Sequence, residues 1–225
     1  MENNIIENRK KTIRIIFNGL IIFFVVLGVV IDVIKLDTAT ALSAFTIQSN
    51  LLCLIAAAVT LALEIKKKDA KGKAYIFFKG MTLTSIFLTF IVYNFILKPL
   101  MGETNNTQSF MLADALLHTV VPLMMLGDFI FFEKKGCFKI WYPFGWTAFP
   151  LYYVGYTAIY KAFGGIYKYH FNDTVSNFPY FFLDYESYGL RTVGIWFLFI
   201  VIGFIGFSYL LVGLDKLFCK IKMHG

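Results

Sequence analysis

The sequence is poor in charge and in cysteine. Charged residues make up 16% of its 225 residues, whereas a soluble domain of this length carries about a quarter. The three cysteines, Cys53, Cys137 and Cys219, are an odd number and lack the spacing of a metal site. We therefore expect reduced thiols, no bound metal and no other cofactor. No internal repeat, low-complexity stretch or cleavable signal peptide is evident.

Apolar residues, by contrast, make up 58% of the chain, and 19% of the residues are aromatic. The formal net charge of +7 would be compatible with nucleic-acid binding. The basic residues, however, stand between long apolar runs, where they set membrane topology. We therefore expect a membrane protein with no nucleic-acid partner, built as a single domain over residues 1–225.

Six apolar runs have about the 20 residues that a helix needs to cross a membrane. We expect each run to be helical, because an open strand would leave backbone groups unsatisfied in lipid. The fold class is thus all-α, an integral membrane bundle of six transmembrane helices. The runs are Ile13–Ile34, Ala39–Leu63, Tyr75–Leu97, Phe110–Phe132, Ile140–Phe163 and Leu190–Leu217.

The basic residues divide unevenly between the two sides of such a bundle. Most of the 21 lysines and arginines lie at the two termini, around the connection from 66 to 73, and between 134 and 139. The other side has only Lys35, Lys98, Lys161, Lys168 and Arg191. The excess of positive charge predicts that both termini are cytoplasmic, in a multi-pass protein of the cell membrane.

Polar side chains from three runs are expected at one level in the outer half of the membrane. Thr46 and His118 each lie roughly 10–12 Å below the outer surface, at 1.5 Å per helical residue. Asp114 is four residues before His118 and shares its helix face. Asn94 approaches the same level from a helix that runs in the opposite direction.

This cluster can be interpreted as a catalytic site. A threonine hydroxyl is a weak nucleophile and needs an adjacent base, which His118 would supply. Asp114 would orient the imidazole, and Asn50 or Asn94 would donate hydrogen bonds to an oxyanion. Pro122 is expected to kink its helix and free a carbonyl near His118. A polar structural network or a transport path would use the same residues.

The long outer connection, residues 164–189, is dense in aromatic residues. A loop of this length is either a lid or binding element, or an interfacial cap over the helix ends. Beyond it, Arg191 is expected to pair with Asp184. We include both residues, together with Gln48 of the polar FTIQSN stretch, among the candidate supporting or substrate-binding residues.

Three stretches, FTIQSNLL at 45–52, LLHTVVPLMMLGDFIFF at 116–132 and NFPYFFLDYESYGLR at 177–191, resemble a bacterial family of six-helix membrane proteins. That family is similar to the animal androgen-induced membrane proteins, which include the androgen-dependent regulator of tissue-factor-pathway inhibitor. The animal members hydrolyse fatty acid esters of hydroxy fatty acids with an intramembrane threonine and histidine. The resemblance implies Thr46 as nucleophile and His118 as base.

Two functions are therefore expected from the sequence. The first is a membrane-embedded threonine hydrolase that cleaves lipid (fatty acyl) esters, fatty acid esters of hydroxy fatty acids among them. The alternative is a small transporter or ligand-binding membrane protein that uses the same outer-half pocket. The partner in both cases is a membrane lipid or lipid-like molecule. The sequence does not define the oligomeric state.

Overall fold

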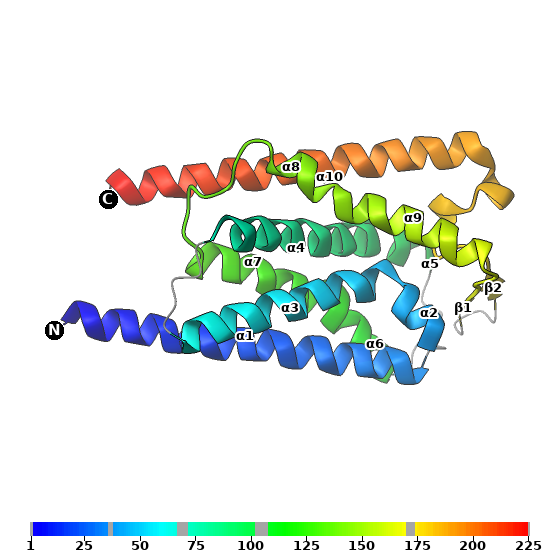
Figure 1. The fold of residues 1–225 in the computed structure, drawn as a ribbon. Helices are drawn as coiled ribbons and strands as arrows, with labels where there is room; N and C mark the ends of the chain where they lie inside the picture. The colour runs from blue at the N-terminus through cyan, green and yellow to red at the C-terminus, as the bar shows by residue number, and fades with distance from the viewer. Residues whose placement is uncertain (1, 36–37, 67–71, 102–107, 170–173, 225) are drawn as a thin grey trace.

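The computed structural model describes residues 2–35, 38–66, 72–101, 108–169 and 174–224. The chain in these ranges is almost entirely helical (Figure 1). The α-helices are α1 (Glu2–Lys35), α2 (Thr38–Ser43), α3 (Phe45–Ile65), α4 (Lys73–Val92), α5 (Lys98–Met101), α6 (Gln108–Ala115), α7 (Val121–Phe132), α8 (Tyr142–Trp146), α9 (Ala148–Ala162) and α10 (Tyr185–His224). Two π-helical turns, η1 (Tyr93–Leu97) and η2 (Leu116–Val120), one 3₁₀ turn, η3 (Phe181–Leu183), and a hairpin of β1 (Tyr167–Tyr169) and β2 (Thr174–Ser176) complete the described elements.

Five of the helical segments are long and apolar enough to cross a membrane, as the sequence predicted for these regions. They are Ile6–Ile34, Phe45–Ile65, Lys73–Leu100, Met111–Phe132 and Tyr185–Ile221. Their outward faces carry exposed apolar side chains such as Ile16 and Phe23 on α1 and Leu198 and Ile202 on α10. The all-α prediction is confirmed. Lys67, Lys68 and Lys71 of the 66–73 connection lie outside the described residues.

The predicted fifth run, Ile140–Phe163, differs from expectation because it is divided into α8 and α9, and neither piece alone is long enough to span. The division follows from Pro150, which has no N–H to donate to the carbonyl of Trp146 four residues earlier. Thr147 joins the two pieces, because its amide donates to the carbonyl of Pro143 (3.2 Å) and its carbonyl accepts the amide of Leu151 (3.1 Å).

The predicted second run, Ala39–Leu63, is also not one helix. It is interrupted at Ala44, whose ψ of 139° is extended. The amide of Ala44 closes α2 on the carbonyl of Ala41 (3.1 Å), and the amide of Gln48 opens α3 on the carbonyl of Ala44 (3.1 Å). Neither proline nor glycine stands at this position. The break therefore depends on tertiary contacts.

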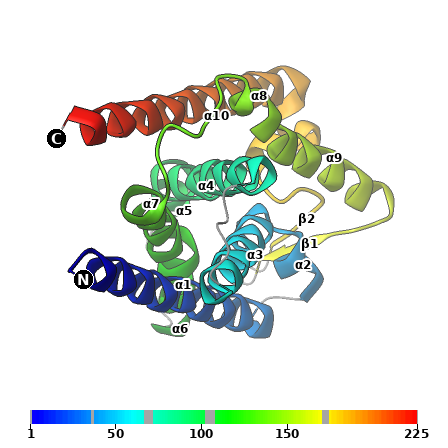
Figure 2. The ribbon, with the colours of Figure 1, turned by 60° about the vertical axis from the view of Figure 1, so that its left-hand side comes forward.

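The helices form a bundle in which α4 is central (Figures 1 and 2). Helix α4 contacts α3 and α7 on one side and α8, α9 and α10 on the other. Both termini lie at one end of the bundle, while the hairpin and α2 lie at the opposite end (Figure 1). Close approach depends on small residues: a Cβ at Gly80 would lie 2.1 Å from the Trp146 ring.

A buried charge network joins four helices near the end of the bundle that holds the termini. Lys79 of α4 bonds Asp128 of α7 (2.7 Å), and the amide of Asn18 donates to the same carboxylate (2.9 Å). Arg14 of α1 bonds Glu64 at the end of α3 (2.9 Å) and Glu133 after α7 (2.5 Å). Asp128 is only 1% exposed. The sequence had grouped Lys79 with the topology-setting charges, but its side chain is buried in this network.

The network predicts a specific stability pattern. Asp128→Asn leaves the Lys79 ammonium buried without its closest partner, so we expect a loss of roughly 3–5 kcal/mol in the free energy of unfolding. The double variant Lys79→Met/Asp128→Leu removes both charges and should recover most of that loss. Thermal or denaturant unfolding in detergent measures both.

Glu186→Gln is the matched control, since it breaks the surface pair with Lys161 and should change stability little. A double variant as unstable as Asp128→Asn alone would contradict the paired-charge account.

Candidate functional site

Thr46 and His118 meet at hydrogen-bond distance. Thr46 lies at the second position of α3, and His118 lies in the middle of η2. The Thr46 Oγ1 is 3.1 Å from the His118 Nε2. Both side chains are partly buried, and the two residues come from segments 72 positions apart in the sequence. The expected proximity of these two residues is therefore present.

Asp114 lies on the other side of the imidazole. Its Oδ1 is 3.0 Å from the His118 Nδ1, and its backbone carbonyl is 3.1 Å from the same nitrogen. Both acceptors require a proton on Nδ1, since neither oxygen can donate. The neutral ring then carries a lone pair on Nε2, where the Thr46 hydroxyl donates. The three residues thus form a chain of hydrogen bonds with the polarity of a nucleophile, a base and an orienting carboxylate.

The π-helical turn η2 and Pro122 expose backbone carbonyls around His118. Pro122 cannot donate to the His118 carbonyl four residues earlier, and that carbonyl accepts the Asn94 amide instead (3.1 Å). The neighbouring Leu117 carbonyl accepts the Asn50 amide (3.1 Å). The freed carbonyl expected from Pro122 is therefore observed. Such π-helical irregularities occur often at functional sites.

Asn50 and Asn94 hold the backbone and do not point their donors at an oxyanion. Asn50 divides its two amide hydrogens between the carbonyls of Thr46 (2.8 Å) and Leu117. Asn94 divides its two between the carbonyls of Phe90 (2.9 Å) and His118. No amide hydrogen is left on either side chain, so the geometry does not give the expected oxyanion role. Instead, Asn50 fixes α3 to η2, and Asn94 fixes η1 to η2.

Tyr93 covers the imidazole. Its ring stacks on His118 with a centroid separation of 3.7 Å and an interplanar angle of 21°. The Tyr93 hydroxyl also interacts with the Asp114 carboxyl group. Tyr93 thus limits the motion of both the His118 ring and the Asp114 carboxyl group.

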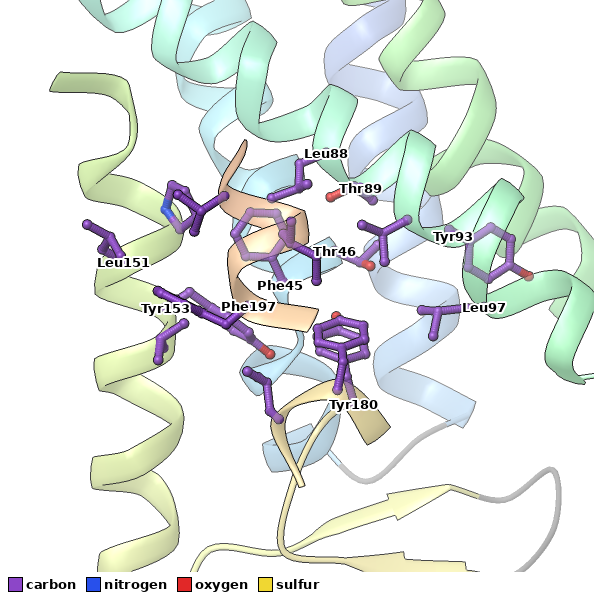
Figure 3. Close-up of a pocket in the computed structure, with 17 residues that line it drawn as sticks. Phe45, Thr46, Leu88, Thr89, Tyr93, Leu97, Leu151, Tyr153, Tyr180 and Phe197 are labelled. Carbon is purple, nitrogen blue, oxygen red and sulfur yellow. The ribbon is translucent and has the colours of Figure 1, made fainter. Parts of the chain in front are cut away.

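An apolar pocket opens beside Thr46 (Figure 3). Its empty space, including the open mouth, is about 690 Å³. The lining includes Thr46, Thr89 and Tyr93 and is otherwise mostly apolar. The apolar lining comes from α4, η1, α9, α10 and the 177–183 segment and includes Leu88, Val92, Leu97, Leu151, Val154, Phe182, Phe197, Ile200 and Val201.

Tyrosine hydroxyls satisfy the backbone groups that the break at Ala44 releases. Tyr153 donates to the carbonyl of Ser43 (3.1 Å), and the Tyr156 hydroxyl bonds the Ser43 hydroxyl (2.8 Å). Tyr180, from the outer connection, interacts with the Thr46 and Tyr153 side chains and with the backbone N–H groups of Phe45 and Thr46. Burial raises the pKa of the Tyr180 hydroxyl, and those hydrogen bonds oppose the rise. Tyr180 is therefore a neutral phenol at physiological pH.

The remaining candidate residues lie apart from this cluster. Asp184 accepts the amide of Ser187 (2.9 Å) and so caps the first turn of α10. Arg191 is exposed, and among the described residues no ion pair joins it to Asp184, which corrects the expected pairing. The Oε1 of Gln48 is buried without a hydrogen-bond partner among the described residues.

Sequence reasoning did not identify Tyr93 or Tyr180 as part of the site. Tyr153 and Tyr156, from the predicted fifth run, also reach into the α2–α3 break. Aromatic residues are so frequent in this sequence that site tyrosines differ from the others only in lying beside the polar cluster, which the sequence does not give. Within the described ranges, no group of three or more His, Cys, Asp or Glu side chains has the arrangement of a metal site.

No family model, curated protein or solved structure matches this chain in sequence or fold comparisons. The candidate site therefore rests on its own geometry.

The hydrogen-bond chain predicts the tautomer of His118. In protein labelled with ¹⁵N-histidine at neutral pH, Nδ1 should be protonated and Nε2 should not, which the two ¹⁵N chemical shifts report directly. Asp114→Ala should shift the population toward the Nε2–H tautomer, because Nδ1–H then loses its carboxylate acceptor and keeps only the backbone carbonyl. An Nε2–H tautomer in the wild type would contradict the role of Nε2 as acceptor from Thr46.

Proposed function

We propose that this protein is a membrane-embedded threonine hydrolase of fatty acyl esters. The single observation that carries the proposal is the continuous chain from the Thr46 hydroxyl through His118 to Asp114. The resemblance of the sequence to a family of threonine ester hydrolases supports the same assignment. Thr46 is the nucleophile, His118 is the general base, and Asp114 is the positioning residue.

Acylation follows from the bond polarity. The Thr46 Oγ1 forms a bond to the ester carbonyl carbon while its proton passes to the His118 Nε2. The tetrahedral intermediate then collapses, the bond from the carbonyl carbon to the alcohol oxygen breaks, and that oxygen takes the proton from Nε2. The alcohol leaves, and the acyl group remains on Thr46. The Asp114 carboxylate stabilises the imidazolium that exists between the two proton transfers.

Deacylation repeats these transfers with water. Nε2 takes a proton from a water molecule as the water oxygen bonds to the acyl carbon. The intermediate collapses, the bond to Thr46 Oγ1 breaks, and Oγ1 recovers its proton from Nε2. The products are a carboxylic acid and the free threonine. The sum is ester hydrolysis, with the protein unchanged.

The pocket favours an ester with a long apolar acyl chain. Its lining between α4, α9 and α10 buries apolar surface, and each methylene buried there contributes about 0.8 kcal/mol. A site at this depth takes its substrate from the membrane itself. Fatty acid esters of hydroxy fatty acids are the substrate class that the sequence resemblance suggests.

The proposed enzyme has six spans, with α8 and α9 together as the fifth. These two helices cover residues 142–162, about 30 Å at the helical rise. The lysine-rich end of the bundle, which also holds both termini, then faces the cytoplasm of the cell membrane. The pocket and the 177–183 segment lie in the outer half.

The catalytic assignment is tested by hydrolysis of a p-nitrophenyl acyl ester by purified protein in detergent or liposomes. Thr46→Val keeps the shape of the side chain, and His118→Ala removes the base. Each should lower kcat by roughly a thousandfold or more, while thermal unfolding shows that the fold remains. Thr46→Ser should retain part of the activity, because the hydroxyl is kept.

Thr84→Val is the matched control, since Thr84 is buried and bonds only the carbonyls of Gly80 and Met81. It should hydrolyse the ester like the wild type. Binding of the ester without release of p-nitrophenol by the wild type would instead favour a binding or transport protein.

A further inference from the structure

The N-terminus of α3 presents backbone N–H groups without helical partners. The first amide that closes the helix is that of Gln48, on the carbonyl of Ala44. The amides of Phe45, Thr46 and Ile47 precede it, so they have no helical carbonyl one turn earlier to bond. The N-cap residue is Ala44, and no side chain of its own caps this end. Helical bonding therefore does not use the N–H groups of Phe45 and Thr46, which stand beside the proposed nucleophile.

The same turn carries the proposed nucleophile. Thr46 contributes both the hydroxyl that attacks and one of these two amides, so the carbonyl oxygen of an attacked ester would lie close to both N–H groups. Charge develops on that oxygen in the transition state, and two preorganised backbone donors at a helix N-terminus stabilise it. The side-chain amides of Asn50 and Asn94 are already used by backbone carbonyls.

The Tyr180 side chain lies at this end of α3, where it lines the pocket together with Phe45 and Thr46. The Tyr180 hydroxyl interacts with the Phe45 and Thr46 amides and with the Thr46 side chain. Figure 3 shows the Tyr180 ring rising from the outer connection toward Thr46, at the mouth of the pocket. Stacking on Phe182, at a centroid separation of 5.0 Å and an angle of 12°, fixes the direction of the ring.

We infer that the backbone N–H groups of Phe45 and Thr46 are the oxyanion site of the proposed hydrolase, and that Tyr180 is a latch whose hydroxyl fills this site until an ester displaces it. This inference rests on the proposed function. The hydroxyl satisfies the two donors inside the membrane when no substrate is bound. The substrate carbonyl replaces it, so no N–H group is left unsatisfied at any stage.

The oxyanion site is tested by Phe45→Pro. Phe45 is the first residue of α3, where proline is tolerated because no helical bond needs its N–H, and Ala44 already has the extended backbone that a residue before proline requires. The substitution deletes one oxyanion donor. Phe45→Ala is the matched control, because it loses the same side chain but keeps the N–H.

Turnover of the p-nitrophenyl ester by Phe45→Pro should be roughly 10²–10³-fold lower than turnover by Phe45→Ala, with the same thermal unfolding temperature within a few degrees. Equal turnover by the two variants overturns the oxyanion assignment.

The latch is tested by Tyr180→Phe, which keeps the ring and removes the hydroxyl. A short-chain alkyl fluorophosphonate reacts with the nucleophile and needs the oxyanion site to be empty. Its second-order rate constant for labelling Thr46 should rise roughly 5- to 10-fold, the equilibrium contribution of about one hydrogen bond. Tyr188→Phe, an exposed residue on the same side of the molecule, should label at the wild-type rate.

An unchanged or slower rate in Tyr180→Phe overturns the latch, and a slower rate would make the hydroxyl a donor to the reaction. Absence of Thr46 labelling in wild type and variant alike would overturn the proposed hydrolase itself, so the two failures are distinguishable.

A measurement on protein with an intact Tyr180 covers the case in which Tyr180→Phe does not fold. Phe181 packs edge-on against Trp196 at 5.3 Å, so displacement of Tyr180 should change the environment of this tryptophan. Fluorophosphonate labelling should alter the tryptophan emission of the wild type, and Trp196→Phe should lose that change. Identical emission before and after labelling contradicts the displacement.

Discussion

The backbone groups of an interrupted helix must be satisfied where the break is buried, and this requirement determines the structure around Ala44. The break between α2 and α3 releases the carbonyl of Ser43 and the amides of Phe45 and Thr46. Buried away from water, each such group would cost several kcal/mol if it had no partner. The Tyr153 hydroxyl of α9 donates to the Ser43 carbonyl. The Tyr180 hydroxyl of the outer connection interacts with the amides of Phe45 and Thr46. The same break places the Thr46 side chain at the first turn of a helix, beside a pocket.

A second irregular helix completes the site. The π-helical turn η2, followed by Pro122, turns the carbonyls of Leu117 and His118 away from their own helix, and Asn50 and Asn94 bind them. These bonds fix the position of His118 along the bundle relative to α3 and η1. Its Nε2 therefore lies within hydrogen-bond distance of the Thr46 hydroxyl. Irregular backbone is thus concentrated at one end of the bundle. At the other end, regular helices are joined by the paired charges of Arg14, Lys79 and their carboxylates, which gives the irregular end a rigid support.

Length and apolar composition predicted the five long apolar helices, but not the interruptions of the second and fifth runs. Pro122 predicted its freed carbonyl, since the missing N–H is a local property of proline. The matching depths of Thr46 and His118 placed them at one level, whereas their contact is visible only in the structure. The break at Ala44 was not predictable, because no proline or glycine is present there and the stabilising tyrosines are more than 100 residues away. The roles of Asn50, Asn94 and Lys79 were missed for a related reason: a sequence gives the depth of a side chain but not the acceptor toward which it points.

The central claim is that Thr46 carries the acyl group during turnover. It is tested most directly by mass spectrometry of protein that is quenched in acid while it hydrolyses a fatty acyl ester. The account predicts that the peptide containing Thr46 gains the mass of the acyl group, with fragment ions that place it on the threonine hydroxyl. Sustained hydrolysis with an unmodified Thr46 peptide, or with the acyl group on another residue, would contradict it.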